Sequence, residues 1–464
     1  MWSKPQKFSI MISFENIDKF DWLYDFYMNY LCIMHNHIYY RHFYILNQEN
    51  IPEKGQPTIV IANHQNGMMD AMAILHTMFR DRRQPVFIAR GDIFKKDSVA
   101  RILRFLKIMP TFRSRDGNVS DVKSNLALYN RAARVLRKGG TIVIFPEATH
   151  QSGHFMNTFK KGFARIAFSA EELNDYQLGL QVLPLNIHYS NYFNFRSDLM
   201  VTVGKPFTLE EFFDTYKENH DKGYLALNEK ARARVKEITP DIDIPEYYNE
   251  IDALTQMMSE PLLKSKGLNP NNLPNQKDAA MTIIANIRQY RDDTPDKFEQ
   301  LMLKMREYMS LLKKLGLQNW IVNRKLSIFR LVLRILSMIV TLPLYLFGFI
   351  NNYVPRSITK HFTNKIEDPM LHSSVQYVIG TVATFPIFYL LIMAIVWIIS
   401  KHFWIALLYI VLTFITAFFV HYYKIAFRKL RTFFRARYFR KTDDYQRLCQ
   451  LNTEINEEME GIIF

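Results

Sequence analysis

Residues 58–70 read TIVIANHQNGMMD and join an apolar strand to a polar turn. The first five residues are apolar or β-branched, which is typical of a strand inside a sheet. His64 lies in the turn that follows, and Asp70 falls early in the next helix. A carboxylate there can hold one imidazole nitrogen, so that the other nitrogen can deprotonate a hydroxyl. Taken alone, a His and an Asp at this spacing are common, so the pair needs support from its surroundings.

Apolar runs of the same kind recur through residues 50–206, separated by amphipathic stretches. These further strands are expected at Pro85–Ala89, Ile108–Phe112, Thr141–Phe145, Gln181–Ile187 and Leu199–Gly204. Helices are expected at Asp92–Leu106 and Val119–Arg137. The alternation predicts an α/β fold with a mixed, largely parallel sheet flanked by helices.

Polar side chains follow two other predicted strands. Arg113 follows one of them, and Glu147 and His150 follow another. The ends of strands in such sheets gather at one rim, where ligands bind. Arg113, His150, Lys160 and Lys161 could therefore converge on a phosphate as charge-assisted donors. Alone, Arg113 is more often a solvated surface charge.

The order of these blocks resembles the glycerol-3-phosphate and 1-acylglycerol-3-phosphate acyltransferase family, the phospholipid/glycerol acyltransferases. The matching blocks are Asn63-His64 with Asp70, Pro110-Thr111-Phe112-Arg113, Phe145-Pro146-Glu147, and the strand Val182–Ile187 with its proline. The resemblance implies an acyltransferase-type sheet and a membrane-associated enzyme of phospholipid biosynthesis. Its expected acceptor is glycerol-3-phosphate or lysophosphatidic acid.

The resemblance also implies roles for the matching positions. His64 is expected to be the general base on the acceptor hydroxyl, with Asp70 as its partner, and no acyl-enzyme intermediate is expected. The expected substrate-binding residues are Asn63, Arg113, Glu147, His150, Lys160 and Lys161. No cofactor and no metal are expected, and acyl-CoA or acyl-carrier protein is the expected co-substrate.

Two departures from the family pattern leave the acceptor open. Five residues separate His64 from Asp70, one more than usual, which resembles the branch with fungal-type glycerol-3-phosphate/dihydroxyacetone-phosphate acyltransferases. His150 lies near the place where many members carry arginine, and histidine is only partly charged at neutral pH. The alternatives are an O-acyltransferase for a non-phosphate lipid acceptor, or a catalytically idle membrane scaffold of the same fold.

Composition divides the rest of the chain. Residues 1–49 are rich in aromatics and fit either an interfacial amphipathic helix or a helix packed on the domain core. Residues 50–206 are the expected acyltransferase catalytic domain, and 207–325 an accessory helical region. Residues 326–442 are the expected membrane region with a basic flank, and 443–464 a C-terminal tail.

Two uncharged stretches predict a membrane hairpin. Residues 377–399 and 403–420 each approach the roughly 20 residues that cross a bilayer. A shorter stretch, 335–350, contains Pro343 and is expected to be interfacial or re-entrant. The chain is therefore expected to be a multi-pass membrane protein.

The overall charge predicts an anionic partner. Lys and Arg number 59 against 44 acidic residues, which gives a net charge of +15. The sequence has no zinc-finger spacing and no aromatic RNA-binding signature, so an anionic lipid membrane is expected and nucleic acid is not. Only Cys32 and Cys449 are present, which favours an intracellular compartment.

The basic flanks predict the orientation of the membrane region. Arg324–Arg334 and Lys424–Lys441 are rich in Lys and Arg, and such clusters favour the cytoplasmic side. The catalytic domain is thus expected on the cytoplasmic face. In a background with Cys32 and Cys449 changed to Ser, we expect a cysteine at Arg437 to react with an impermeant maleimide only after the membrane is opened. Labelling from outside sealed cells would contradict this orientation.

Overall fold

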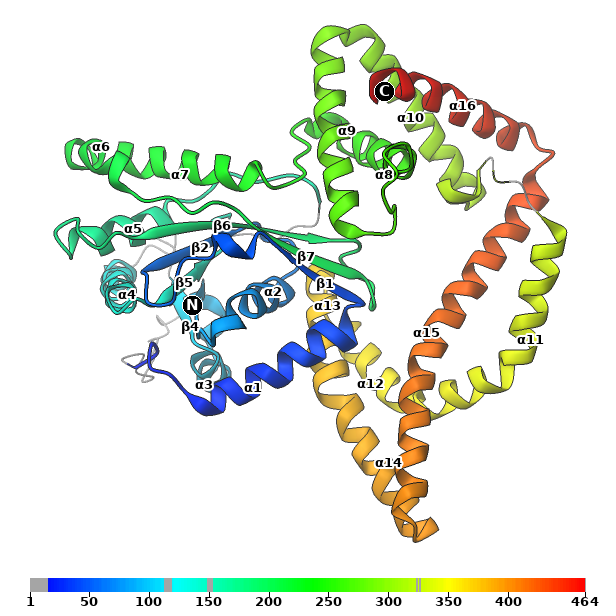
Figure 1. Ribbon diagram of the computed structural model, residues 1–464, viewed down its shortest axis with the longest axis horizontal. Coiled ribbons are helices and arrows are strands. Elements are labelled where there is room, and N and C mark those ends of the chain that lie inside the picture. The colour runs from blue at the N-terminus through cyan, green and yellow to red at the C-terminus, as the bar shows by residue number, and fades with distance from the viewer. Residues whose placement is uncertain (1–15, 112–118, 148–152, 323, 325–326, 464) are drawn as a thin grey trace, which may run out of the picture. The chain divides into compact units, whose positions relative to one another are not determined.

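The chain forms two compact units (Figure 1). The structure is a computed structural model that describes residues 16–111, 119–147, 153–322, 324 and 327–463. The first unit comprises Met1–Thr239 and Asp368–Ser374, and the second comprises Pro240–Glu367 and Val375–Phe464. The first unit contains the strands, and the second is helical in the part that the structure describes. The first unit continues past residue 206, where the sequence placed the end of the catalytic domain.

A seven-stranded sheet forms the centre of the first unit, with the order β1-β7-β6-β2-β5-β3-β4. Its strands are β1 His42–Leu46, β2 Thr58–Ala62, β3 Val86–Arg90, β4 Ile108–Thr111, β5 Thr141–Ile144, β6 Gln181–Tyr189 and β7 Asp198–Val203. β6 and β7 are antiparallel, and the other neighbours are parallel. The predicted mixed, largely parallel sheet is confirmed.

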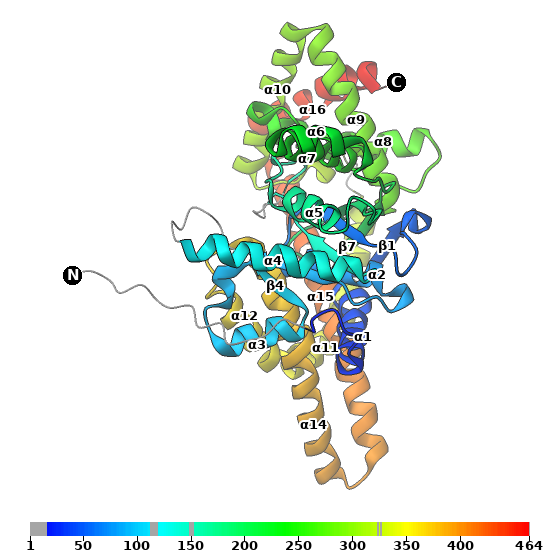
Figure 2. The same ribbon diagram turned by 90° about the vertical axis from the view of Figure 1, so that its left-hand side faces the viewer.

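Helices cover both faces of this sheet (Figures 1 and 2). They are α1 Trp22–Ile33, the π-helix Met34–Tyr39, α2 Met68–Met78, α3 Asp97–Phe105, α4 Val119–Arg137, α5 Gly162–Glu172, α6 Phe213–Glu218 and α7 His220–Lys236. α5 and α7 lie on one face, and α1 and α2 lie on the other. α6 and α7 follow residue 206 and still belong to the first unit.

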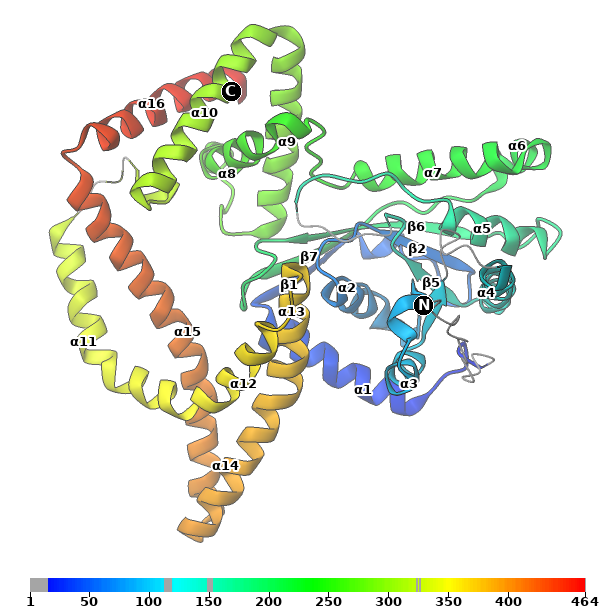
Figure 3. The same ribbon diagram turned by 180° about the vertical axis from the view of Figure 1, so that it is seen from behind.

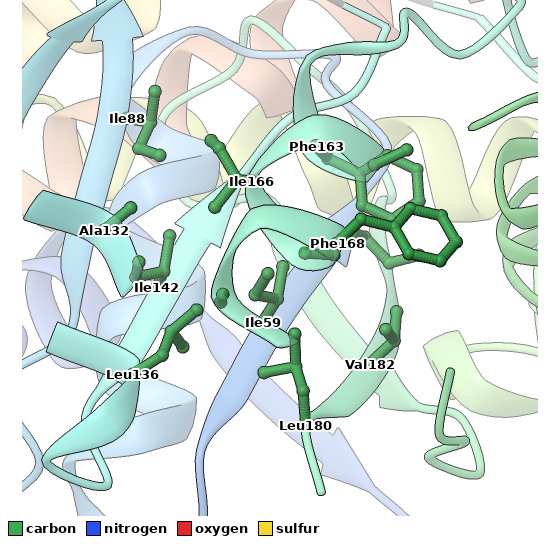
Figure 4. Packing of buried hydrophobic residues seen from close by; sticks show 14 of the residues in the cluster. Ile59, Ile88, Ala132, Leu136, Ile142, Phe163, Ile166, Phe168, Leu180 and Val182 are labelled. Carbon is green, nitrogen blue, oxygen red and sulfur yellow. The ribbon is translucent and has the colours of Figure 1, made fainter. Parts of the chain in front are cut away.

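The hydrophobic core of the first unit lies between the sheet and helices α4, α5 and α7. In Figure 4, Ile59 of β2 and Ile142 of β5 lie close to Ile166 of α5. Ala132 and Leu136 of α4 close the same cluster from the side. These side chains are fully buried or nearly so, and burial of each is worth roughly 1.5–3 kcal/mol for a large aliphatic residue.

Helix α1 packs on the first unit with one side only. Tyr24, Met28 and Cys32 are spaced four residues apart and are buried, whereas Trp22 and Phe26 are 74% and 66% exposed. The spacing follows from the helical period, which puts residues four apart on one face. The buried face therefore shows that α1 packs on the rest of the first unit. An interfacial role for the exposed face stays a prediction.

Four helices form most of the hydrophobic core of the second unit (Figure 3). They are α8 Tyr248–Ser265, α9 Leu273–Asp293, α10 Pro295–Leu315 and α16 Asp443–Ile463. α16 comes from the expected C-terminal tail and buries Leu448, Leu451 and Ile455 in this core. The accessory helices therefore pack with the end of the chain.

Within the described residues, three helices are long and apolar enough to cross a membrane. They are Ile328–Asn351 (α11), Pro369–Ser400, which ends in α14 (Phe385–Ser400), and Phe403–Phe439 (α15). Between them lie α12 (Tyr353–Thr363), α13 (His372–Val375) and the π-helix Gln376–Thr384. α14 and α15 run side by side in Figures 1 and 2.

The apolar stretch 335–350 lies in α11, which continues through Pro343 and has 24 residues. The helix that contains it is therefore long and apolar enough to cross a membrane, as are the helices of the expected hairpin. The interfacial or re-entrant placement of 335–350 stays a prediction. α15 has 37 residues, which corresponds to about 55 Å at the rise of an α-helix. That exceeds the roughly 30 Å of a hydrocarbon core, so α15 is longer than a membrane crossing requires.

Gly139 offers a test of the packing in the first unit. It has φ +71°, and a Cβ there would lie 2.1 Å from the Gly55 carbonyl oxygen. We expect Gly139→Ala to lower the free energy of unfolding by at least about 1–2 kcal/mol, because a left-handed backbone alone costs that much with a side chain. Thermal unfolding in detergent measures the change.

Gly162→Ala is the matched control. It has an ordinary φ, and no atom lies within 4 Å of an added Cβ. Equal stability of the two variants would contradict the close approach at Gly139.

Candidate active site

The ends of β2 and β5 bring two functional residues together. The parallel pairing aligns Ile61 with Ile144, so His64 and Glu147 each lie three residues beyond the aligned pair. The backbone N–H of His64 hydrogen-bonds to the Glu147 carboxylate. The imidazole of His64 stacks on Phe145 with ring centroids 4.1 Å apart. Sheet register therefore places the Phe145-Pro146-Glu147 block directly beside His64.

His64 and Asp70 form the hydrogen bond that their spacing suggested. His64 Nδ1 lies 2.8 Å from Asp70 Oδ2. Because an ionised carboxylate only accepts hydrogen bonds, this contact assigns the proton to Nδ1 and leaves Nε2 as the basic nitrogen. The His64 side chain is 18% exposed, and that of Asp70 is fully buried.

The Asp70 carboxylate is held by the turn that precedes its own helix. Oδ2 also accepts the backbone N–H groups of Gln65 and Asn66, each at 2.7 Å. A carboxylate in the first turn of a helix is favourable because the N–H groups there lack helical partners. The turn and the carboxylate thus fix each other, and with them the orientation of His64.

Tyr189 is a site residue that the sequence did not indicate. Its hydroxyl donates to Asp70 Oδ1 at 2.6 Å, and burial raises its pKa, so it stays a donor. Tyr189 lies at the end of β6, 119 residues from Asp70. No local pattern marks such a partner, because sheet order alone brings it there.

Glu147 is buried and holds a second turn. Its Oε2 accepts both the backbone N–H and the side-chain Nδ2 of Asn157, at 3.1 and 3.0 Å. Burial raises the pKa of Glu147 above the ordinary 4.5, and the hydrogen bonds from Asn157 and His64 oppose the rise. Asn157 was also missed from sequence, since it lies in an irregular segment.

Asn63 bridges two strands. Its Nδ2 donates to the carbonyl of Ile187 at 2.9 Å, and its Oδ1 accepts the Ile187 N–H at 2.7 Å. The side chain is buried and continues the pairing of β2 with β6 beyond the last strand residue. Its expected contact with substrate stays a prediction.

The other expected phosphate ligands are placed differently. Lys161 Nζ forms an ion pair at 2.7 Å with Asp221 of α7. The Lys160 side chain is exposed, and its backbone N–H donates to the Pro146 carbonyl at 2.8 Å. Arg113 and His150 lie outside the described residues. Among the residues that the structure describes, no group of three or more His, Cys, Asp or Glu could hold a metal ion.

Comparison with known proteins adds a family and several relatives. Residues 42–188 match the family model described as Acyltransferase. The chloroplast 1-acyl-sn-glycerol-3-phosphate acyltransferase LPAT1 of Arabidopsis thaliana is 24% identical over 139 residues, which is 30% of this chain and 34% of that protein. The 1-acyl-sn-glycerol-3-phosphate acyltransferase of Borreliella burgdorferi is 28% identical over 149 residues, 32% of this chain and 52% of that protein.

A solved structure is also similar to part of the chain. The 1-acyl-sn-glycerophosphate acyltransferase PlsC of Thermotoga maritima has 19% sequence identity and a TM-score of 0.32, with 46% of this chain and 81% of that chain covered. The chain spans 34% and 52% of the length of these two curated relatives, which are among those it matches.

The raised pKa of Glu147 predicts a pH dependence of stability. Below the ordinary pKa of 4.5, the carboxyl is protonated in both folded and unfolded chains. As the pH rises through that value, the unfolded chain loses its proton first, so the folded state loses stability relative to a variant without the acid. We expect the melting temperature of wild type to fall relative to Glu147→Gln over this pH range.

Glu53→Gln is the matched control, because Glu53 is exposed. The difference in melting temperature between Glu53→Gln and wild type should not change with pH in this way. If the difference in melting temperature between wild type and Glu147→Gln stayed constant with pH, or changed in the opposite direction, this would contradict the effect of burial.

Proposed function

We propose that the chain is a membrane-bound enzyme that acylates a lipid hydroxyl, because residues 42–188 match the family model described as Acyltransferase. The proposed reaction moves an acyl group from a thioester to 1-acylglycerol-3-phosphate and yields a diacylated glycerol phosphate. The observation that carries the proposal is the 2.8 Å contact between His64 Nδ1 and Asp70 Oδ2 at the sheet rim.

The geometry of this pair supports a direct transfer. His64 Nε2 removes the proton from the acceptor hydroxyl while the oxygen attacks the thioester carbonyl carbon. The new C–O bond forms, the C–S bond breaks, and the imidazolium returns the proton to the leaving thiolate. Asp70 stabilises the imidazolium in between, and its four hydrogen bonds fix its position.

The choice of acceptor rests on the relatives and on the basic residues that the sequence offers for a phosphate. Both curated relatives are named as 1-acyl-sn-glycerol-3-phosphate acyltransferases, which favours lysophosphatidic acid over glycerol-3-phosphate. We assign the phosphate to Arg113, His150 and Lys160, and the glycerol backbone to the neighbourhood of Glu147. The fungal-type branch would instead favour glycerol-3-phosphate or dihydroxyacetone phosphate, so these acceptors belong in the same assay.

The donor and the location complete the proposal. Acyl-CoA and acyl-carrier protein are both suitable thioesters, and neither requires a metal or a cofactor in this mechanism. Three apolar helices support a membrane location. We propose several membrane crossings, a catalytic domain on the cytoplasmic face, and contact of the basic surface with anionic lipids.

The test is acyl incorporation by the full chain purified in membranes. Lysophosphatidic acid, glycerol-3-phosphate, dihydroxyacetone phosphate and a phosphate-free lysolipid are offered in parallel, each with acyl-CoA and with acyl-carrier protein. We expect incorporation into lysophosphatidic acid, and a loss of about 10²–10⁴-fold in kcat for His64→Ala, the usual contribution of a general base.

His402→Ala is the matched control, because His402 is exposed in the turn between α14 and α15. Activity of His64→Ala equal to that control would remove His64 from the mechanism. Incorporation only into the phosphate-free lipid would favour the non-phosphate acceptor. No incorporation by folded wild type with either donor would favour the idle scaffold.

A further inference from the structure

Residues 368–374, which we call the strap, belong to the first unit although they follow it by more than a hundred residues in sequence. The candidate membrane-spanning helix Pro369–Ser400 begins inside the strap. Asp368 caps its first turn by accepting the Met370 N–H at 2.9 Å. The strap is thus an ordered piece of chain that leads directly into a membrane helix.

The strap contacts the turn that carries the proposed base. The backbone N–H of Met68 donates to Ser374 Oγ at 3.1 Å. Met68 is the first residue of α2, where backbone N–H groups have no partner within the helix. Asp70 accepts the N–H groups of Gln65 and Asn66, and Ser374 accepts that of Met68. One acceptor of the catalytic turn therefore comes from the strap.

A second contact reaches the same turn through Tyr192. Ser373 Oγ donates to the Tyr192 carbonyl at 2.6 Å, and Asn66 Nδ2 donates to the same carbonyl at 2.8 Å. The Tyr192 hydroxyl lies 3.2 Å from Gln65 Oε1 and donates to it. Ser373 and Asn66 are fully buried, so these bonds are shielded from water and costly to lose.

Steric contact adds to the hydrogen bonds. Gly67 has φ +51°, and a Cβ on it would lie 2.9 Å from Leu371 Cδ2 and 3.3 Å from Ser374 Oγ. The turn and the strap are therefore in close contact, and a side chain at Gly67 would require Leu371 and Ser374 to shift. The backbone of residues 65–68 is therefore held both by the strap and by the Asp70 carboxylate.

We propose that Ser373 and Ser374 are positioning residues for acyl transfer, and that the strap completes the active site of this chain. The proposal rests on the proposed function. His64 precedes the turn held by the strap, so a looser turn lets the imidazole leave its reactive orientation. Since residues 42–188 match the family but the strap lies outside them, that domain alone lacks a part of its own site.

The test compares Ser374→Ala and Ser373→Ala with Ser357→Ala in the full-length protein in membranes. Ser357 is half-buried in α12 and is the matched control. We expect kcat of the two strap variants to fall by about 10–100-fold, the usual effect of a small displacement of a catalytic group. KM for the acceptor should stay unchanged, and Ser374→Thr, which keeps the hydroxyl, should restore kcat.

Hydrogen exchange supplies a readout that needs no activity. Peptides covering residues 63–75 should exchange faster in Ser374→Ala than in Ser357→Ala, with equal melting temperatures. Unchanged kcat in the strap variants, or a rise in KM with normal kcat, would overturn the positioning role even if exchange changed. If wild type acylates no acceptor, the proposed function fails, and unchanged exchange would then independently overturn the strap contact.

Discussion

Burial of one ionised carboxylate governs the arrangement of the candidate site. Asp70 is fully inaccessible to solvent, and an unpaired buried charge would cost several kcal/mol. Its oxygens are satisfied by His64, by two N–H groups of the turn and by Tyr189. These partners come from the end of β2, the start of α2 and the end of β6. The requirement to satisfy one charge therefore fixes the junction of three elements.

Local patterns in the sequence predicted most of the sheet. The strand at Thr58–Ala62 and the helix Val119–Arg137 were predicted with the observed bounds, because period and turn signals both act within a few residues. β1 was missed because His42–Leu46 lies in a segment so rich in aromatics that no alternation stands out. The sequence predicted the pairing of His64 with Asp70. It did not indicate Tyr189, because strand order decides the neighbours of that residue. It did not indicate Asn157 either, because Asn157 lies in an irregular segment.

The apolar helices of the second unit carry polar groups that hydrogen-bond to one another. Asn352 Nδ2 donates to the Thr413 carbonyl at 3.2 Å, and its Oδ1 accepts the Tyr389 hydroxyl at 2.7 Å. Polar side chains in an apolar layer favour such pairing, since lipid offers them no alternative. These bonds link Asn352, the C-cap of α11, to α14 and α15. The second unit therefore owes the association of its apolar helices partly to side-chain hydrogen bonds.

The contact between Met68 and Ser374 joins residues 306 positions apart, and this separation has a consequence for biosynthesis. Domains fold as the chain leaves the ribosome, with N-terminal parts first. The sheet can assemble once β7 has been made, but the turn before α2 still lacks its acceptor Ser374. That acceptor emerges only after α11, the first long apolar helix, has been translated. The order of synthesis thus delays the contact between Met68 and Ser374 until this long apolar helix has been made.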